Sequence, residues 1–405
     1  MPRSPRISWH SNSRRAVDKD FLPGNRIDLL TTGSEYFPAL LEAIAAALVE
    51  VRIESYIFEN DALGRRVVDA LLQAARRGVA VHVMVDGFGA SGFMPAFGAE
   101  LIGAGVEVQV YRPEVARFKF RRHRLRRMHR KLVAVDARIA FVGGINIIDD
   151  MNVEHMPKQT PPRYDYALRI EGPLLAPIHA AMRHLWKLVG WASLQRRPDA
   201  PTICEAATTA CGNMTAAFLI RDNLGHRRDI EDAYLAAIAA AQSEIIIANA
   251  YFLPGRSFRQ ALTAAARRGV KVTVLLQGRV EYLLLHYASQ ALYGALLAAD
   301  VRIYEYRRSF LHAKVAVIDG HWATVGSSNI DPFSLLLARE ANVVVKNSAF
   351  AAGLLASLRL AMQQGAVEVR REDWKKKFWP VRMAHWLAYA LVRLMVGLAG
   401  YAREH

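Results

Sequence analysis

Apolar residues recur along the chain in two alternating patterns: a helical period, then a short and almost continuous apolar run. In the first part of the chain these patterns predict helices over 35–48 and 63–77 and strands over 51–58 and 79–86. Strands this apolar are buried on both faces, which is typical of a mostly parallel sheet covered by helices. The pattern therefore predicts an α/β fold.

The same order of elements returns later in the chain. Alternating helices and strands are predicted there at 230–242, 244–252, 257–268 and 270–277. The segment Ala-Ala-Arg-Arg-Gly-Val, which ends a helix at a glycine and begins a strand, occurs at 74–79 and again at 265–270. The chain is therefore predicted to be an internal duplication of two pseudo-symmetric α/β halves, each a mostly parallel or mixed sheet flanked by helices.

The duplication sets the predicted domain boundaries. Residues 1–25 are polar and basic and are expected to form a flexible leader. The two halves are expected over 26–195 and 214–370, joined by a linker over 196–213 in which Arg, Pro, Thr and Cys replace periodic structure. Residues 371–405 are expected to form a basic, amphipathic tail.

Each half also carries one copy of a motif that is rich in reactive side chains. Its residues in the two copies are His129, Lys131, Asp136, Gly144 and Asn146, and then His312, Lys314, Asp319, Ser327 and Asn329. A lone His-x-Lys pair on a strand is usually a surface feature. Two copies with His, Lys, Asp and Asn at identical offsets, one in each half, point to function instead.

Each copy is expected to fold as a β-hairpin. On a strand, residues two apart face the same side, so His129 and Lys131 point together. A two-residue turn at 137–138 would place Asn146 opposite His129 and gather His, Lys and Asn at one end of the hairpin. Asp136 would lie beside the turn and orient its backbone. In the second copy, a two-residue turn at 320–321 would place Asn329 opposite His312 in the same way.

This set of side chains suits a phosphoryl oxyanion. Lysine supplies a compact positive charge, and amide or backbone N–H groups supply aimed donors. One histidine can attack phosphorus while the other protonates the leaving oxygen, if the two copies form one site at the interface of the halves. No metal or other cofactor is expected, because two lysines and two asparagines can neutralise the charge.

The motifs resemble the phospholipase D superfamily signature, His-x-Lys-x4-Asp-x6-Gly-Gly/Ser-x-Asn, in both copies. Over about residues 25–370 the chain is similar to bacterial cardiolipin synthases of the B type. The resemblance implies a double displacement, in which one histidine forms a phosphohistidine with a phosphatidyl group. It implies His129 as the nucleophile and His312 as the acid and base, although the pseudo-symmetry would allow the reverse.

The resemblance also implies roles for the other motif residues. The expected catalytic residues are His129, Lys131, Asp136, His312, Lys314 and Asp319, and the expected substrate-binding residues are Gly144, Asn146, Ser327 and Asn329. An acidic residue past each motif is expected to orient the histidine of that motif, Asp165 in the first half and Glu340 in the second. Gly144 stands where the superfamily more often has serine, so the first half is expected to lack a hydroxyl donor.

The charge of the chain calls for an anionic partner. The net charge is +16 and the pI is near 10, which fits nucleic acid, anionic lipid or a phosphate substrate. Arginines and lysines run from 117 to 131 without an acidic residue and lead into the first motif. Phe118 and Phe120 alternate with these charges, which favours anionic headgroups at a membrane surface, although the same charges could bind nucleic acid.

The apolar run over 383–401 bears on the membrane as well. It approaches the length of a transmembrane span, but Arg393 would lie near the bilayer centre at a cost of about 2.5–3.5 kcal/mol. In a helix, Arg382, His385 and Tyr389 share one stripe while the large apolar residues lie elsewhere. This arrangement is typical of a helix lying in the membrane interface. A helix packed on the protein body and a true span are the alternatives.

The expectation is therefore a phosphatidyltransferase that makes cardiolipin from two phosphatidylglycerol molecules and releases glycerol. Its expected partners are phosphatidylglycerol, other anionic phospholipids and a membrane surface, without nucleic acid. It is expected to be peripheral, on the cytoplasmic side of the cell membrane. One alternative is hydrolysis by the same residues, as in a phospholipase D or a nuclease. Another is an inactive lipid- or nucleic-acid-binding scaffold.

Overall fold

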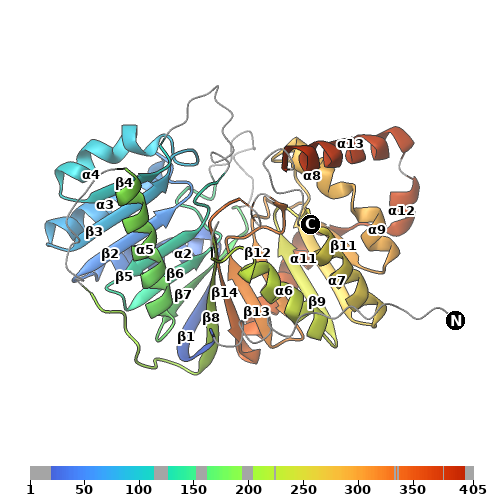
Figure 1. Ribbon diagram of the computed structural model, residues 1–405, viewed down its shortest axis with the longest axis horizontal. Coiled ribbons are helices and arrows are strands. Elements are labelled where there is room, and N and C mark those ends of the chain that lie inside the picture. Colours follow the sequence, from blue (N-terminus) through green and yellow to red (C-terminus); the bar gives the residue numbers. More distant parts are fainter. Residues whose placement is uncertain are drawn as a thin grey trace.

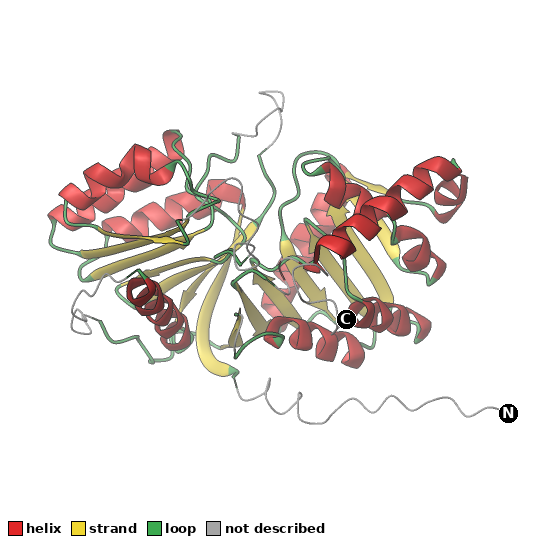
Figure 2. Ribbon diagram, turned by 45° about the horizontal axis from the view of Figure 1, so that its top comes forward, coloured by secondary structure: helices red, strands yellow, loops and turns green. Residues whose placement is uncertain are grey.

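The computed structural model describes residues 20–113, 126–151, 162–193, 204–222, 225–332, 334, 337–376 and 378–396. A wide β-sheet runs through the molecule, and helices cover both of its faces (Figure 1, Figure 2). The first half of the chain forms one side of the molecule and the second half forms the other.

Among the described residues, the sheet has 15 strands in the order β15-β11-β10-β9-β12-β13-β14-β8-β1-β7-β6-β5-β2-β3-β4. The strands of the first half are β1 (Leu22–Thr31), β2 (Glu50–Ser55), β3 (Ala80–Asp86), β4 (Glu107–Tyr111), β5 (Lys131–Val135), β6 (Ile139–Gly143) and β7 (Tyr166–Glu171). Those of the second half are β8 (Met214–Arg221), β9 (Glu244–Asn249), β10 (Lys271–Gln277), β11 (Arg302–Tyr306), β12 (Lys314–Ile318), β13 (Trp322–Gly326), β14 (Glu340–Lys346) and β15 (Ala366–Glu368).

Strand order is repeated outward from the middle of the sheet. The series β1-β7-β6-β5-β2-β3-β4 matches β8-β14-β13-β12-β9-β10-β11, and β15 adds one edge strand. In each half three strands are parallel, β2–β4 and β9–β11, and the motif hairpins pair antiparallel. The predicted duplication into two α/β halves with mixed sheets is confirmed.

Helices connect and cover these strands. In the first half they are α2 (Thr32–Ala45), α3 (Ala62–Arg76), the π-helix η1 (Met94–Gly98), α4 (Ala99–Gly103) and α5 (Leu175–Ala192). In the second half they are α6 (Asp229–Ala240), α7 (Arg256–Arg267), α8 (Leu283–Gln290), α9 (Tyr293–Ala298), α11 (Ser348–Gly365), α12 (Arg371–Lys376) and α13 (Trp379–Val396). The helices and strands predicted from the apolar pattern are all present, with ends shifted by up to three residues (35 against Thr32, and 58 against Ser55).

Strands β1 and β8 join the two halves edge to edge and were not predicted. β1 pairs with β7 of its own half and with β8 of the other, so the sheet is continuous. Residues 22–25, expected in the flexible leader, therefore begin a strand. In the expected linker, the backbone N–H groups of Cys211 and Gly212 donate to Gly24 O, at 2.8 and 3.1 Å.

A shared hydrophobic core holds the halves together. One cluster of buried side chains takes members from both motif hairpins and their neighbouring strands, including Leu132, Val142, Leu168, Val315, Val325 and Val343. The hairpins are therefore fixed relative to each other by a common core. This core sets the geometry of any site between them.

Helix α13 packs across α8. His385 and Val392 are buried there, at 2% and 0% exposure, while Trp386, Leu387 and Leu391 face outward. The stripe containing His385 and Tyr389 thus faces the protein body, as in the alternative of a helix packed on the body. Among the described helices, none combines the length and apolar character that a bilayer crossing requires.

Candidate active site

The two motif histidines come from opposite halves and each is held by the backbone of the other half. The His129 N–H donates to Arg339 O at 2.9 Å, beside a short parallel bridge between Met128 and Arg339. The His312 N–H donates to Tyr164 O at 2.8 Å in the same way. The segments that lead into β5 and β12 thus cross the interface between the halves.

Each histidine also hydrogen-bonds a carboxylate from the opposite half. His129 Nδ1 lies 2.9 Å from Glu340 Oε1, and His312 Nδ1 lies 2.6 Å from Asp165 Oδ2. The expectation that each acidic residue orients the histidine of its own half is wrong. Because these carboxylates begin β14 or precede β7, next to the junction of the halves, they reach across the interface to the facing histidine.

The carboxylates define which ring nitrogen is available for chemistry. A carboxylate on Nδ1 fixes that atom as the proton donor, which leaves the Nε2 lone pair free to attack or to accept a proton. The His129 side chain is 17% exposed and that of His312 is 9% exposed. Burial lowers the pKa of His129 and lowers that of His312 well below its usual range. Both rings are therefore suited to be neutral bases.

The motif lysines lie beside the histidines, as the strand alternation predicts. Lys131 Nζ donates to His129 O at 2.5 Å, and Lys314 Nζ donates to His312 O. Burial lowers the pKa of Lys131 to about 7 and that of Lys314 to about 8. Burial raises the pKa of Asp165 to about 6. At a pH below these values, the site therefore holds two buried ammonium groups that can receive an anion.

Ser327 and Gly144 occupy equivalent places under the two carboxylates. Ser327 Oγ donates to Glu340 Oε2 at 2.5 Å. A Cβ atom at Gly144 would lie 2.4 Å from Asp165 Oδ1, so the shorter aspartate occupies the space that a serine would need. The expected absence of a hydroxyl donor in the first half thus has a steric cause.

The hairpin register is one residue away from the predicted one. Lys131 pairs with Gly143, and Val135 pairs with Ile139, so three residues form the turn instead of two. β12 and β13 show the same register. Asp136 and Ala137 have φ of 49° and 45°, which places the turn in the left-handed region. The predicted opposition of residues 129 and 146 is therefore wrong.

The motif aspartates bind backbone at the turn end of each hairpin, away from the histidines. The Asp136 carboxylate accepts from the N–H groups of Leu48, Val49 and Glu50, at 2.8–2.9 Å. Asp319 accepts from the N–H groups of residues 242, 243 and 244 in the same way. The aspartates bind backbone, but it is the backbone of the loop before β2 or β9 and not, as predicted, that of their own turn. This geometry does not fit their place among the catalytic residues.

The motif asparagines differ between the halves. Asn146 Oδ1 accepts from the Ile57 N–H at 3.1 Å, which ties the loop after β2 to the first motif. Asn329 is 3% exposed, and its Oδ1 has no hydrogen-bond partner among the described residues. Asn329 therefore retains an unused polar atom that a substrate could satisfy.

Tyr56 and Asp86 complete the first motif, and the sequence did not single them out. The ring of Tyr56 packs edge-on against His129, with centroids 4.7 Å apart, and Lys131 Nζ lies 5.2 Å from its centre. Asp86 accepts from the Met128 N–H at 2.9 Å. Both lie at the carboxyl ends of predicted parallel strands, which is where α/β sheets usually carry their ligand-binding sites. This position is the feature of the sequence that could have identified them as site residues.

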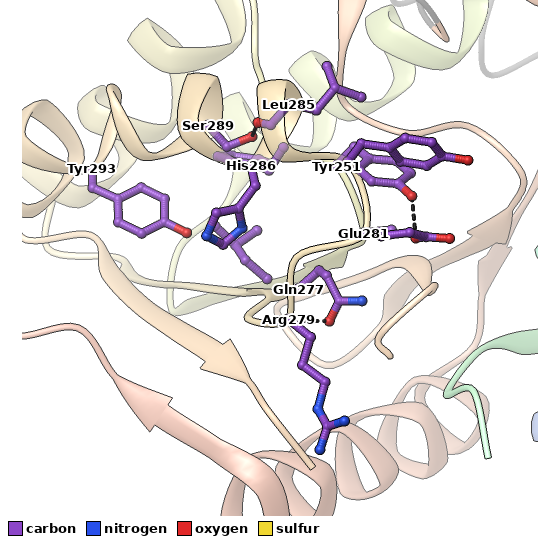
Figure 3. A pocket seen from close by; sticks show the side chains of 12 residues that line it. Tyr251, Gln277, Arg279, Glu281, Leu285, His286, Ser289 and Tyr293 are labelled. Atoms are coloured by element: carbon purple, nitrogen blue, oxygen red, sulfur yellow. Dashed lines mark hydrogen bonds between the residues drawn. The ribbon is translucent and has the colours of Figure 1, made fainter. Parts of the chain in front are cut away.

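A small cavity lies beside the second motif, at the carboxyl ends of β9 and β10 (Figure 3). Its volume of about 20 Å³ is enough for one water-sized group. Gln277 Oε1 accepts from the Leu311 N–H at 3.2 Å, as Asp86 does from Met128. Across the cavity, the Tyr251 hydroxyl donates to Glu281, which lies 3.8 Å from Arg163.

Residues 117–125 of the basic run, including Phe118 and Phe120, lie outside the described residues. Within the described end of the run, Arg130 is 3% exposed and forms an ion pair with Glu54. The Arg127 guanidinium lies over Phe88, 5.2 Å from the ring centre. Arg130 is therefore structural and does not fit the expected capture of headgroups.

Comparisons with known proteins agree with this geometry. The family profile described as "Cardiolipin synthase, PLD-like domain" matches residues 40–156 and 234–359. Cardiolipin synthase B of Salmonella typhimurium is 39% identical over 393 residues, covering 94% of this chain and 91% of the relative. Cardiolipin synthase B of Escherichia coli K12 is 38% identical over 393 residues, with coverage of 94% and 91%.

A crystal structure of phosphatidylserine synthase from Haemophilus influenzae has the same fold, with a TM-score of 0.71 at 11% identity. The match covers 96% of this chain and 99% of that one. The profile match takes in both motif copies, and the relatives match over nearly the whole chain. The chain therefore belongs to the cardiolipin synthase family of the phospholipase D superfamily and is a phosphatidyltransferase.

Proposed function

We propose that the enzyme makes cardiolipin by moving a phosphatidyl group from one phosphatidylglycerol molecule to a second, with release of glycerol. The observation that carries the proposal is the pair of Nδ1-bonded histidines, each held by a carboxylate of the opposite half and each next to a buried lysine. Two facing histidines supply both an attacking atom and an acid. The names of the relatives point to cardiolipin as the product.

In the first step, His129 Nε2 attacks the donor phosphorus, and the bond between phosphorus and the glycerol oxygen breaks. His312 gives its proton to that oxygen, so glycerol leaves as the neutral alcohol. The raised pKa of Asp165 lets the Asp165–His312 pair take up a second proton, beyond the one on Nδ1, near pH 6, and a bound phosphodiester anion favours this protonated form further. The lowered pKa of His129 suits the nucleophile.

In the second step, a hydroxyl of the acceptor phosphatidylglycerol attacks the phosphohistidine. His312 takes the hydroxyl proton, the phosphorus–nitrogen bond breaks, and cardiolipin leaves. Lys131 and Lys314 balance the charge of the phosphoryl oxygens in both transition states. Ser327 steadies Glu340, and the unpaired Asn329 Oδ1 is available to a substrate hydroxyl.

Both substrates are lipids, so the enzyme is proposed to act as a peripheral protein on the cytoplasmic side of the cell membrane. The high positive charge of the chain favours a surface rich in anionic phospholipids. Hydrolysis by the same residues, with water as the acceptor, is the competing reaction.

The test is to incubate purified enzyme with phosphatidylglycerol vesicles and measure lipid products and free glycerol. Cardiolipin and glycerol in equal amounts are expected, and His129→Ala or His312→Ala should each lower the rate by roughly 1,000-fold. In an acid-free quench, His312→Ala should still retain labelled phosphatidyl group, whereas His129→Ala should not. Phosphatidic acid as the only product, or nicking of DNA, would refute the proposed transfer.

A further inference from the structure

A cavity of about 270 Å³ lies between α9, α12 and α13, separate from the histidines. Its floor is made of small residues between 291 and 298, including Gly294 and Ala295. Trp374, Trp386, Arg371 and Arg382 line the cavity as well. The size approaches that of known small-ligand pockets, about 300–1,000 Å³. None of its lining residues belongs to the two motifs.

The two arginines of this cavity are available for an anion. Both are exposed, and neither has an ion-pair partner within the part of the chain that the structure describes. A guanidinium presents a planar fork of donors that matches phosphate oxygens in a two-point contact. Two such groups around one apolar-floored cavity suit a phosphate that carries an apolar body.

The outward face of α13 provides a surface for that apolar body. Trp379, Leu387 and Leu394 are 65%, 64% and 59% exposed, and they extend the exposed row formed by Trp386 and Leu391. Contiguous exposed apolar residues of this kind mark a binding surface, whereas single ones do not. Tryptophan is enriched where proteins meet the membrane interface.

The opposite side of α13 is packed on the protein body, so the outward face is not exposed merely because the helix is undocked. The ring of His385 stacks between Tyr287 and Trp374, with centroid distances of 5.4 and 5.6 Å. Val392 is fully buried on the same side of α13. One side of α13 is therefore buried against the protein body, and the other side is free to contact a binding partner.

The surface also lies beside the catalytic site. Helix α13 crosses α8, and α8 follows the loop that carries Glu281 and Tyr282 (Figure 1). Both residues line the small cavity next to His312's motif, and Glu281 lies 3.8 Å from Arg163. Tyr282 and Leu283, at the start of α8, are exposed apolar side chains as well, at 58% each. A bilayer lying against α13 would meet the site at the same edge of the sheet.

We propose that the cavity between α9, α12 and α13 binds the phosphate of an anionic phospholipid while the outward face of α13 lies in the membrane interface. Arg371 and Arg382 hold the phosphate, and the acyl chains lie along the leucine and tryptophan face. This is a second lipid site, distinct from the histidines, that docks the enzyme on anionic membrane. It rests on the proposed function only in that the substrates are membrane lipids.

The test measures co-flotation of the full-length His129→Ala protein, which cannot turn over lipid, with vesicles of phosphatidylcholine alone or with phosphatidylglycerol added. The doubly substituted R371Q/R382Q protein should bind phosphatidylglycerol vesicles about 10-fold more weakly. The matched control is R66Q/R76Q, which removes two exposed arginines of α3 in the other half. That control should lose no more than about 2-fold. An equal loss in both proteins would overturn the site.

A second pair of substitutions tests the apolar face. Leu387→Ser with Leu391→Ser should weaken binding to the same vesicles by about 100-fold without changing the unfolding temperature, because both side chains are exposed. Unchanged binding would overturn the docking surface. Inorganic phosphate at millimolar concentration should not release the unsubstituted protein from vesicles; release would show that free phosphate alone fills the cavity and would overturn the lipid assignment.

The same proteins separate this inference from the proposed function. If R371Q/R382Q in the active background binds vesicles normally while cardiolipin is still made, only the second site is refuted. If the unsubstituted enzyme binds vesicles as expected but makes no cardiolipin, only the proposed function is refuted.

Discussion

Asp165 and Glu340 differ by one methylene group, and the residues beneath them differ to match. Gly144 leaves room for the short carboxylate, whereas Ser327 donates to the long one at 2.5 Å. The two pairs are alternative ways to hold a carboxylate against a histidine of the opposite half. The motif alone predicted the missing hydroxyl at Gly144 but not its reason, since the steric conflict exists only in three dimensions.

We expect Gly144→Ser to lower the rate of cardiolipin formation by about 100-fold, because the new Cβ displaces Asp165 from His312. Adding Asp165→Glu should recover at least about 10-fold of that loss, because the pair then copies Ser327 and Glu340. Initial rates of the single and double variants on phosphatidylglycerol vesicles provide the measurement. A double variant slower than Gly144→Ser would contradict this steric account.

The lowered pKa values of the two lysines predict that activity depends on pH. Below pH 7 both carry a proton, and as pH rises through about 7 for Lys131 and about 8 for Lys314 their charges are lost. Their attraction for a phosphodiester should disappear in the same window, so kcat/KM, which reports the free enzyme, should fall across it. Initial rates from pH 6 to 10 in mixed micelles at fixed ionic strength measure this fall.

Lys131→Arg is the informative variant for that profile. Because arginine keeps its charge over the whole range, the remaining fall should move toward the pKa of Lys314, about 8, even if the maximal rate is lower. A profile that stays level to pH 10 in the unsubstituted enzyme would rule out titrating lysines.

At the scale of elements, each motif hairpin is tied at its far end to the loop that precedes the neighbouring parallel strand. Asp319 and Gly320 have φ of 50° and 65°, so a three-residue turn replaces the tight turn predicted from the spacing. The aspartate adopts this conformation because three backbone N–H groups, from 242, 243 and 244, converge on its carboxylate. Spacing along the chain does not reveal such a tie, so the register was predicted one residue away.

We expect Asp319→Ala to lower the free energy of unfolding by about 1–3 kcal/mol, because it leaves those N–H groups without their acceptor. The activity of the folded protein should remain within about 2-fold, since the carboxylate lies at the turn end of the hairpin. Denaturant unfolding and initial rates measure the two effects. Glu42→Ala, at an exposed position of α2, controls for the loss of a carboxylate. Lost activity with unchanged stability would assign Asp319 to catalysis instead.

At the scale of the whole molecule, the sequence predicted the two halves and the residues that meet between them, but not how they meet. Duplicated offsets show which residues are equivalent, and apolar runs show which strands are buried. The exchange of Asp165 and Glu340 between histidines depends on how β1 and β8 join the sheets and on the core shared by the hairpins. Neither leaves a periodic signal within one half. The buried side of α13 was likewise hidden, because the rings that contact His385 lie on α8 and α12 and not on α13 itself.

The exchanged carboxylates have a consequence for the history of the chain. A single half placed against a copy of itself, related by a twofold axis, would assemble both histidine–carboxylate pairs, so an ancestral homodimer could have carried a complete site. Once the two copies were joined in one chain, each histidine–carboxylate pair could change by mutation independently of the other. Gly144 with Asp165, and Ser327 with Glu340, are the divergence that such a fusion permits and that a symmetric dimer forbids.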